Sequence, residues 1–203
     1  MSQVTLVGRS SSHYTRVARI FAHELEIAHA FRPVLDLTTL DTACYGDNPA
    51  LKIPTLIDER GALFGAENIC HALVRRSQKD GVVMRGALDD RLVTNAEELV
   101  LHIMSAEVTL VMAKFTGHAA PPKVVRSIEN SLSWLDERIA AIVGALPAER
   151  SLSFVETSLF CVLTHLPWRE VMDVSSWKRL DDFRRRFEER ESARTTAYRF
   201  DQA

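Results

Sequence analysis

Three consecutive serines, Ser10, Ser11 and Ser12, stand between a strand pattern and a helix pattern near the start of the sequence. A serine at the start of a helix holds its hydroxyl beside backbone N–H groups that have no partner within the helix. The positive end of the helix dipole lies at the same place, so such a site stabilises an anion. The hydroxyl could equally serve only as a helix cap that accepts a backbone hydrogen bond. The residue types alone leave both interpretations open.

The cysteines and histidines form no pattern typical of a metal site. Cys44, Cys70 and Cys161 are widely spaced and include no C-x-x-C pair, which excludes a dithiol redox motif and a zinc site built from cysteines. The seven histidines show no spacing that reads as a metal-binding face. We therefore expect no metal. An odd number of scattered thiols fits a reducing compartment, so we expect a cytoplasmic location.

The composition is that of an ordinary globular protein, with 203 residues, of which 46% are hydrophobic and 26% charged. The 25 lysine and arginine residues nearly balance the 27 acidic ones, which gives a formal net charge of −2. Proteins that bind nucleic acid usually show a basic excess, so we expect no nucleic-acid partner. No apolar run approaches the roughly 18–20 residues needed to span a bilayer, so we expect no membrane partner.

The first eighty residues alternate strand and helix patterns. Short apolar or β-branched runs predict strands, and apolar residues spaced by three and four predict helices. A charged turn that contains Gly61 separates two short apolar runs, which predicts a β-hairpin. The expected elements are a strand at 4–7, a helix at 14–25, a strand at 31–35, hairpin strands at 54–57 and 62–64, and a helix at 67–75. This order predicts a mixed sheet with helices packed on it.

Strand patterns stop beyond residues 78–85, a polar segment that we interpret as a linker. Apolar periodicity then predicts four helices, at 88–117, 121–144, 153–165 and around 177–187. We therefore expect an α/β domain at residues 1–77 and an all-α helical bundle at residues 86–203. The polar tail at 191–203 is expected to cover the surface loosely.

Four segments resemble the glutathione S-transferase family, in the family's order. They are the strand-to-helix turn at 8–19, the loop with Ile53-Pro54 at 48–56, the helix start Gly65-Ala66-Glu67-Asn68-Ile69, and the capping box Ser153-Phe154-Val155-Glu156. Together they span most of the chain. The resemblance is to serine-type, bacterial-like members. It implies a thioredoxin-like N-terminal domain, an all-α C-terminal domain and a cis peptide bond before Pro54.

The resemblance also implies glutathione as co-substrate and a serine that stabilises its thiolate. When Tyr14, Arg16 and Arg19 are aligned with the family's helix-start pattern, Ser12 takes the functional position. Ser12 would act as a hydrogen-bond donor to the thiolate, and not as a nucleophile or base. A shift of one residue would give this role to Ser11, which is the alternative.

Five further residues would hold glutathione, as the resemblance implies. Glu67 would pair with the γ-glutamyl ammonium, and Asn68 would offer backbone and side-chain amides to the γ-glutamyl carboxylate. Ile53, which precedes Pro54, would bond the cysteinyl backbone, and Lys52 would lie near the glycyl carboxylate. The structural alternatives are a first-turn acid, an asparagine helix cap, a buried aliphatic residue and a solvated lysine.

The function implied is a homodimeric transferase that joins the glutathione thiolate to a hydrophobic electrophile. One alternative is a glutathione-dependent isomerase, peroxidase or dehalogenase, because one fold hosts many reactions. The other is a non-catalytic binding or assembly module. Asn68 and His13 favour the module, because they replace the serine or threonine and the proline that many members of the family carry.

Overall fold

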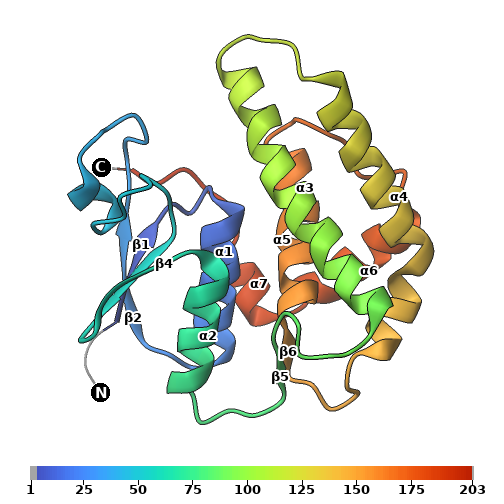
Figure 1. The fold of residues 1–203 in the computed structure, drawn as a ribbon, viewed down its shortest axis with the longest axis horizontal. Helices are drawn as coiled ribbons and strands as arrows, with labels where there is room; N and C mark the ends of the chain where they lie inside the picture. Colours follow the sequence, from blue (N-terminus) through green and yellow to red (C-terminus); the bar gives the residue numbers. More distant parts are fainter. Residues whose placement is uncertain (1–3, 203) are drawn as a thin grey trace. The chain divides into compact units, whose positions relative to one another are not determined.

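The structure is a computed structural model that describes residues 4–202 (Figure 1). Its contacts divide the chain into two compact units. The first contains the chain up to Asp80 together with the segment from Glu191 onward, and the second contains Gly81–Arg190. Within the described residues, no helix has both the length and the apolar character needed to cross a bilayer.

A four-stranded mixed sheet is the centre of the first unit, as the sequence predicts. Its strands are β1 (Val4–Gly8), β2 (His29–Pro33), β3 (Thr55–Asp58) and β4 (Gly61–Phe64), in the spatial order β2-β1-β3-β4. β1 runs parallel to β2 and antiparallel to β3, and β3 and β4 form the expected hairpin. The hairpin turns at Gly61, whose φ of +102° suits glycine.

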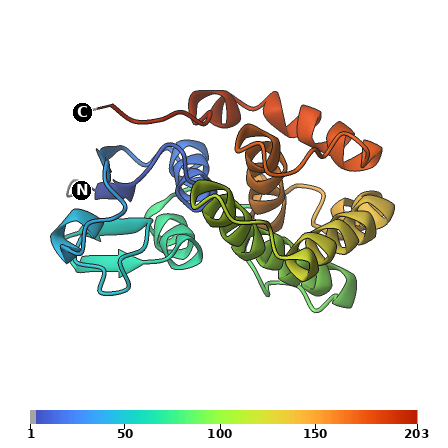
Figure 2. The ribbon, with the colours of Figure 1, turned by 90° about the horizontal axis from the view of Figure 1, so that it is seen from above.

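Two helices cover one face of this sheet, α1 (His13–Glu24) and α2 (Ala66–Arg76). The short helix η1 (Thr42–Tyr45) lies on the opposite face (Figures 1 and 2). The apolar side of each long helix is fully or almost fully buried, with Val17, Ile20 and Phe21 from α1 and Ile69, Cys70 and Leu73 from α2. These are the positions whose spacing predicts the two helices. The layered arrangement is the thioredoxin-like one.

The second unit is a bundle of α3 (Arg91–Phe115), α4 (Pro122–Ala145), α5 (Phe154–Trp168) and α6 (Lys178–Glu188). α5 packs against both α3 and α6, and its side chains are buried almost all round. It extends to Trp168, beyond the expected end before Pro167, and so contains a proline in its last turn.

Two short strands correct the expectation that strands stop after the first half. β5 (Val82–Val83) lies in the segment interpreted as a linker, and it pairs in parallel with β6 (Leu152–Ser153) just before α5. A pair of two-residue strands leaves no periodicity in the sequence that could reveal it.

The C-terminal tail also differs from the expectation, which gave residues 191–203 to the helical domain and a loose place on the surface. It forms a short helix, α7 (Glu191–Thr195), which packs against α1 in the first unit. The Ser192 hydroxyl donates to Glu24 Oε1 at 2.5 Å, and Ser192, Ala193 and Thr196 are buried. The tail is therefore an integral layer of the first unit.

The predicted capping box begins α5. Ser153 is its N-cap residue, and the Ser153 Oγ accepts from the Glu156 N–H at 3.2 Å. The Glu156 carboxylate accepts the Ser153 hydroxyl at 2.6 Å and two hydrogen bonds from Arg150, at 2.7 and 2.8 Å. Burial of Glu156 opposes its ionisation, but the bonds from Arg150 and Ser153 outweigh burial and lower the pKa of this carboxyl.

We predict that Ser153→Ala lowers the free energy of unfolding by about 0.5–2 kcal/mol, the usual cost of losing a side-chain cap. Urea denaturation followed by circular dichroism measures the change. Ser176→Ala is the matched control, because Ser176 is exposed and surface substitutions usually change stability by less than about 0.5 kcal/mol. Equal effects of the two substitutions would contradict the role of the cap.

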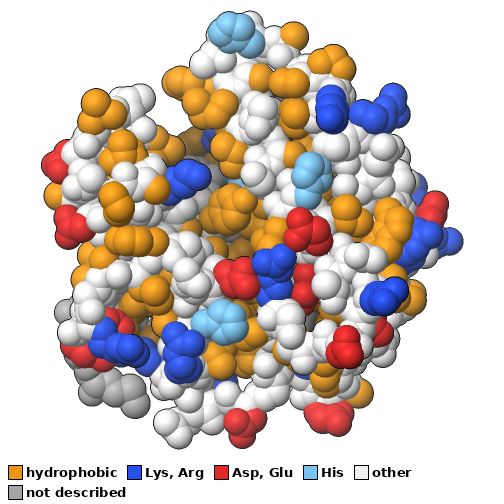
Figure 3. Space-filling model, in the orientation of Figure 1, with side chains coloured by type: hydrophobic (Ala, Val, Ile, Leu, Met, Phe, Trp, Pro, Cys, Tyr) orange, Lys and Arg blue, Asp and Glu red, His pale blue; other side chains and the backbone are white. Residues whose placement is uncertain are grey.

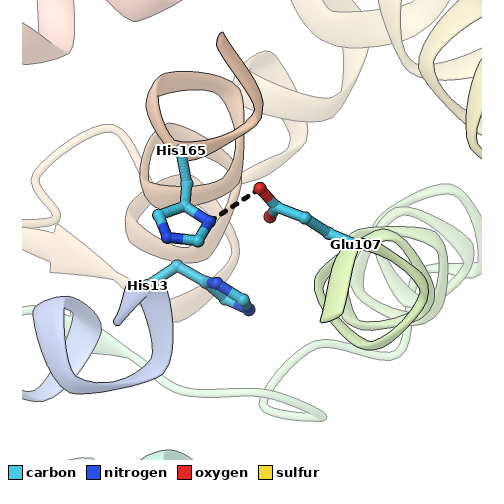
Figure 4. A group of neighbouring side chains, drawn as sticks. All are labelled: His13, Glu107 and His165. Carbon is cyan, nitrogen blue, oxygen red and sulfur yellow. Dashed lines mark hydrogen bonds and ion pairs between the residues drawn. The ribbon is translucent and has the colours of Figure 1, made fainter. Parts of the chain in front are cut away.

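A buried acid–imidazole pair joins α3 to α5 (Figure 4). His165 Nδ1 lies 2.6 Å from Glu107 Oε1, and both side chains are almost completely buried. Burial raises the pKa of Glu107, while the hydrogen bond and charge of His165 and the charge of Arg169 act in the opposite direction and do not cancel it. His13, also drawn in Figure 4, belongs to α1 of the other unit.

The raised pKa of Glu107 predicts a stability that depends on pH. Because the folded state holds this proton more tightly than the unfolded state, the contribution is complete below the ordinary value of 4.5 and is lost as pH rises through the folded value. We expect Glu107→Gln, which cannot ionise, to remove this decline as the pH rises above 4.5. Urea denaturation across that range measures it, with the exposed Glu137→Gln as control; parallel curves for wild type and Glu107→Gln would contradict the prediction.

Candidate functional site

The register of the sheet brings the predicted site segments to one end of it. Val7, near the end of β1, pairs with Thr55 at the start of β3, and Thr55 pairs with Phe64 at the end of β4. The turn after β1, the loop before β3 and the start of α2 after β4 therefore meet at this end of the sheet. These are the three segments of the first unit that the sequence analysis selects.

Gly8 lets the chain turn sharply from β1 into α1. A Cβ atom at this position would lie 2.5 Å from Thr15 Cγ2, so only glycine fits without a shift of the helix. The Arg9 N–H then donates to Thr15 Oγ1 at 3.4 Å. Close contact between the end of the strand and the first turn of the helix fixes where the serines lie.

Ser12 is the N-cap residue of α1. Its Oγ accepts from the Thr15 N–H at 3.2 Å, and its own N–H donates to the Arg9 carbonyl at 3.1 Å, which closes a four-residue turn. The capping role weighed in the sequence analysis is therefore present. A capping hydroxyl uses a lone pair and keeps its proton for another acceptor, so this role is compatible with donation to a ligand.

The two preceding serines have different surroundings. Ser10 is buried, its N–H donates to Asp201 Oδ2 at 2.8 Å, and its Oγ accepts from Arg19 at 3.3 Å. Ser11 is half-buried beside Ser12. Ser10 is thus engaged in holding the turn, while Ser11 and Ser12 both remain candidates for the thiolate.

The loop before β3 is held by the buried side chain of Asn48, which donates to the Lys52 carbonyl at 2.8 Å and accepts from the Ala50 N–H at 3.0 Å. The Ile53–Pro54 peptide bond is cis, as the resemblance implies. Lys52 is exposed and Ile53 is half-buried. Within residues 4–202 no hydrogen bond reaches the Ile53 N–H or carbonyl, so both groups are available to a bound backbone.

Gly65 begins α2 with a φ of +86° and no side-chain cap. Its N–H donates to the Pro54 carbonyl at 3.2 Å, which ties the start of this helix to the cis-proline loop. The first N–H groups of an uncapped helix favour an anion. Glu67 is half-buried in this first turn. The structure therefore brings a helix start and an acid together, as binding of a zwitterionic amino-acid group requires.

Asn68 is not the helix cap that was the structural alternative for it. It is the third residue of α2 and not its cap, and its Nδ2 donates to the Phe64 carbonyl at 3.0 Å. One of its two amide protons is therefore committed to the end of β4.

Arg9 is a charged residue of the site that the sequence analysis passes over. Its Nε is buried and has no hydrogen-bond partner among the described residues 4–202. Hydrogen bonds from Thr38 lower the pKa of the exposed Asp36, and the nearby charge of Arg9 lowers it further. An arginine in the turn before a helix start carries no local pattern that distinguishes it from a surface arginine.

In the second unit, hydrophobic side chains lie over the end of α3 and the start of α4, with lysine or arginine side chains beside them (Figure 3). Met112 is 51% exposed and Phe115 is 77% exposed, whereas Met104 on the same helix is buried. The end of α3 therefore offers apolar surface, and its middle belongs to the core.

The chain is similar to known proteins in part of its sequence and in its fold. Residues 6–80 match the family model described as "Glutathione S-transferase, N-terminal domain". A search of curated proteins finds no match. The fold is similar to a glutathione S-transferase from Methylobacillus flagellatus with glutathione bound, at 22% identity and a TM-score of 0.77, over 97% of this chain and 100% of that one.

The fold is also similar to a glutathione transferase family member from Pseudomonas fluorescens Pf-5 with bound glutathione, at 22% identity and a TM-score of 0.77, over 97% of this chain and 100% of that one. A Tau class glutathione S-transferase from mango is 16% identical, with a TM-score of 0.74 over 97% of this chain and 93% of that one. These findings agree with the resemblance found in the sequence: residues 6–80 match the glutathione S-transferase N-terminal domain model, and the chain as a whole has the fold of solved glutathione S-transferases.

Proposed function

We propose that the protein is a glutathione transferase in which the Ser12 hydroxyl stabilises the glutathione thiolate for attack on a hydrophobic electrophile. The observation that carries this proposal is the position of Ser12. It caps α1 at the end of the sheet where the cis Ile53–Pro54 loop and the start of α2 also lie. Similar solved structures that hold glutathione support this choice of ligand.

The energies involved are sufficient for this role. A free thiol has a pKa near 8.5, so only a few per cent is ionised at neutral pH. A hydrogen bond to a charged acceptor contributes roughly 1.5–3 kcal/mol, and the helix dipole adds about 0.3–1 kcal/mol. Because about 1.4 kcal/mol corresponds to one pKa unit, the two effects lower the thiol pKa by roughly one to three units. A decrease of about two units or more makes the thiolate the major form at neutral pH.

The rest of glutathione would bind along the same end of the sheet. Glu67 pairs with the γ-glutamyl ammonium, and the N–H groups at the start of α2, including that of Asn68, bind the γ-glutamyl carboxylate. The unoccupied N–H and carbonyl of Ile53 bond the cysteinyl backbone. Lys52, which is exposed, pairs with the glycyl carboxylate.

The exposed apolar side chains of Met112 and Phe115 support a hydrophobic electrophile as second substrate. A homodimer and a cytoplasmic location remain part of the proposal. The non-catalytic module is the second candidate, and it is favoured by one observation. The Asn68 side-chain amide is bonded to Phe64, which weakens this residue as a donor to a γ-glutamyl carboxylate.

We predict that Ser12→Ala raises the pKa of the bound glutathione thiol by about one to two units, since it removes the charged hydrogen bond. The ultraviolet absorbance of the thiolate, titrated against pH on the protein, measures it. Ser12→Gly is a matched variant, because glycine begins a helix at a cost of only a few tenths of a kcal/mol but has no hydroxyl. Both variants should raise the pKa equally.

The same titration decides between the two serines. A thiol pKa that rises in Ser11→Ala and not in either Ser12 variant would move the role to Ser11. An increase in Ser12→Ala but not in Ser12→Gly would show that only the helix cap matters, which contradicts hydroxyl donation.

Binding of glutathione distinguishes the enzyme from a non-catalytic module that has lost the glutathione site. We expect wild type to bind glutathione in calorimetry and Glu67→Gln to bind at least about tenfold more weakly, because an ionic hydrogen bond is lost. Glu26→Gln is the control, since Glu26 is an exposed acid elsewhere in the same unit. No binding by wild type would refute the transferase and leave the module.

A further inference from the structure

The C-terminal tail reaches the turn that carries the serines. Asp201 Oδ2 accepts a hydrogen bond from the Ser10 N–H at 2.8 Å, although 191 residues separate the two. Both residues belong to the first unit. Ser10 is almost completely buried, at 1% exposed, and Asp201 is half-buried, so water does not readily replace the carboxylate as acceptor.

Other hydrogen bonds also support the turn at residues 9–12. The Ser12 N–H donates to the Arg9 carbonyl, and the Arg9 N–H makes a long bond of 3.4 Å to Thr15. Ser10 is the second residue of this turn. In such a turn the N–H of the second residue takes no part in the hydrogen bond that closes it. Asp201 satisfies that N–H and thereby fixes the turn two residues before the Ser12 hydroxyl.

A buried arginine holds the tail in place for this contact. Arg16, one helical turn after Ser12, is 4% exposed and donates from Nη2 to the Ala193 carbonyl at 2.9 Å. Its guanidinium lies over the Tyr198 ring, 4.3 Å from the centroid. A cation that bonds the backbone and stacks on an aromatic ring orders the tail just before Asp201.

The charges around Asp201 are mostly positive. Burial lowers the pKa of Arg19, and the nearby Arg199 and Arg16 lower it further, whereas Asp201 raises it. Arg19 in turn donates to the Ser10 hydroxyl at 3.3 Å. Asp201 therefore balances a group of arginines on α1 and the tail, and its place beside Ser10 is favoured electrostatically.

We propose that Asp201 is a positioning residue for the glutathione thiolate: its carboxylate holds the turn at residues 9–12 so that the Ser12 hydroxyl meets the thiol. The inference rests on the role of Ser12 proposed above. Asp201 itself touches neither substrate. The C-terminal segment thus serves thiol activation in the N-terminal domain of the same chain.

The test compares Asp201→Ala with Asp201→Asn by titration of the bound thiol. Asparagine keeps an oxygen that accepts from the Ser10 N–H but carries no charge. Positioning predicts that Asp201→Ala raises the thiol pKa by about one unit, a tenfold change in the ionisation constant, and that Asp201→Asn stays close to wild type. Gln202→Ala, next to it and exposed, should change nothing.

Two results would overturn the inference while leaving the role of Ser12 intact. One is a thiol pKa that Asp201→Ala does not change. The other is an equal decrease in both variants, which is the sign expected if the negative charge of Asp201 acts directly on the thiolate. A merely structural role would lower the melting temperature without shifting the pKa.

Hydrogen exchange in the protein without glutathione tests the contact independently. The amides of Ser10 and Ser12 should exchange faster in Asp201→Ala than in wild type, and Gln202→Ala should match wild type. Unchanged exchange of these amides would refute the positioning contact, whatever the result of the glutathione titration. Wild-type protein that fails to lower the thiol pKa would instead refute the proposed function.

Discussion

The site depends on one constraint: α1 begins almost directly after a buried strand, and its first backbone N–H groups need hydrogen-bond acceptors there. Gly8 leaves room for only a short turn, because the side chain of Thr15 already fills the space of a Cβ. The helix must therefore begin within a few residues, and Ser12 provides the cap. A capping hydroxyl that keeps its proton, at the positive end of a helix, is also what a thiolate requires. The same geometry that begins the helix thus creates the environment proposed for catalysis.

The antiparallel hairpin places the other half of the site. Because β3 starts opposite the end of β1, the loop that precedes it reaches the end of the sheet where α1 begins. The hairpin then returns the chain to that end at Phe64, and α2 starts there. The bond from the Gly65 N–H to the Pro54 carbonyl closes this arrangement. Two helix starts at one end of one sheet concentrate partial positive charge, which suits a ligand with several carboxylates.

Local chemistry explains how much of this could be predicted from the sequence. The apolar spacing of Val17, Ile20 and Phe21 and the turn at Gly61 act over a few residues, so they predict α1 and the hairpin correctly. The Ser153–Glu156 capping box is similarly local. The cis bond before Pro54 leaves no such mark, and only the resemblance to a family implies it.

Contacts between distant segments could not be predicted. The pairing of β5 with β6 and the bond from Ser10 to Asp201 depend on where the folded chain returns, and a polar tail gives no periodicity from which to infer this. Asn68 illustrates a different limit, because an asparagine near a helix start favours a cap until the structure shows Gly65 in that position.

The buried guanidinium of Arg16 explains why the tail belongs to the first unit. A charged group at 4% exposure is costly unless it is paired or hydrogen-bonded. The Ala193 carbonyl and the Tyr198 ring meet that need, and both come from the segment after residue 190. Without the tail, Arg16 would either become exposed to solvent or remain buried without these two partners, one helical turn from Ser12. The N-terminal domain therefore depends on the C-terminal segment for stability at the place where its chemistry is proposed, and this dependence links folding of the chain's end to the state of the site.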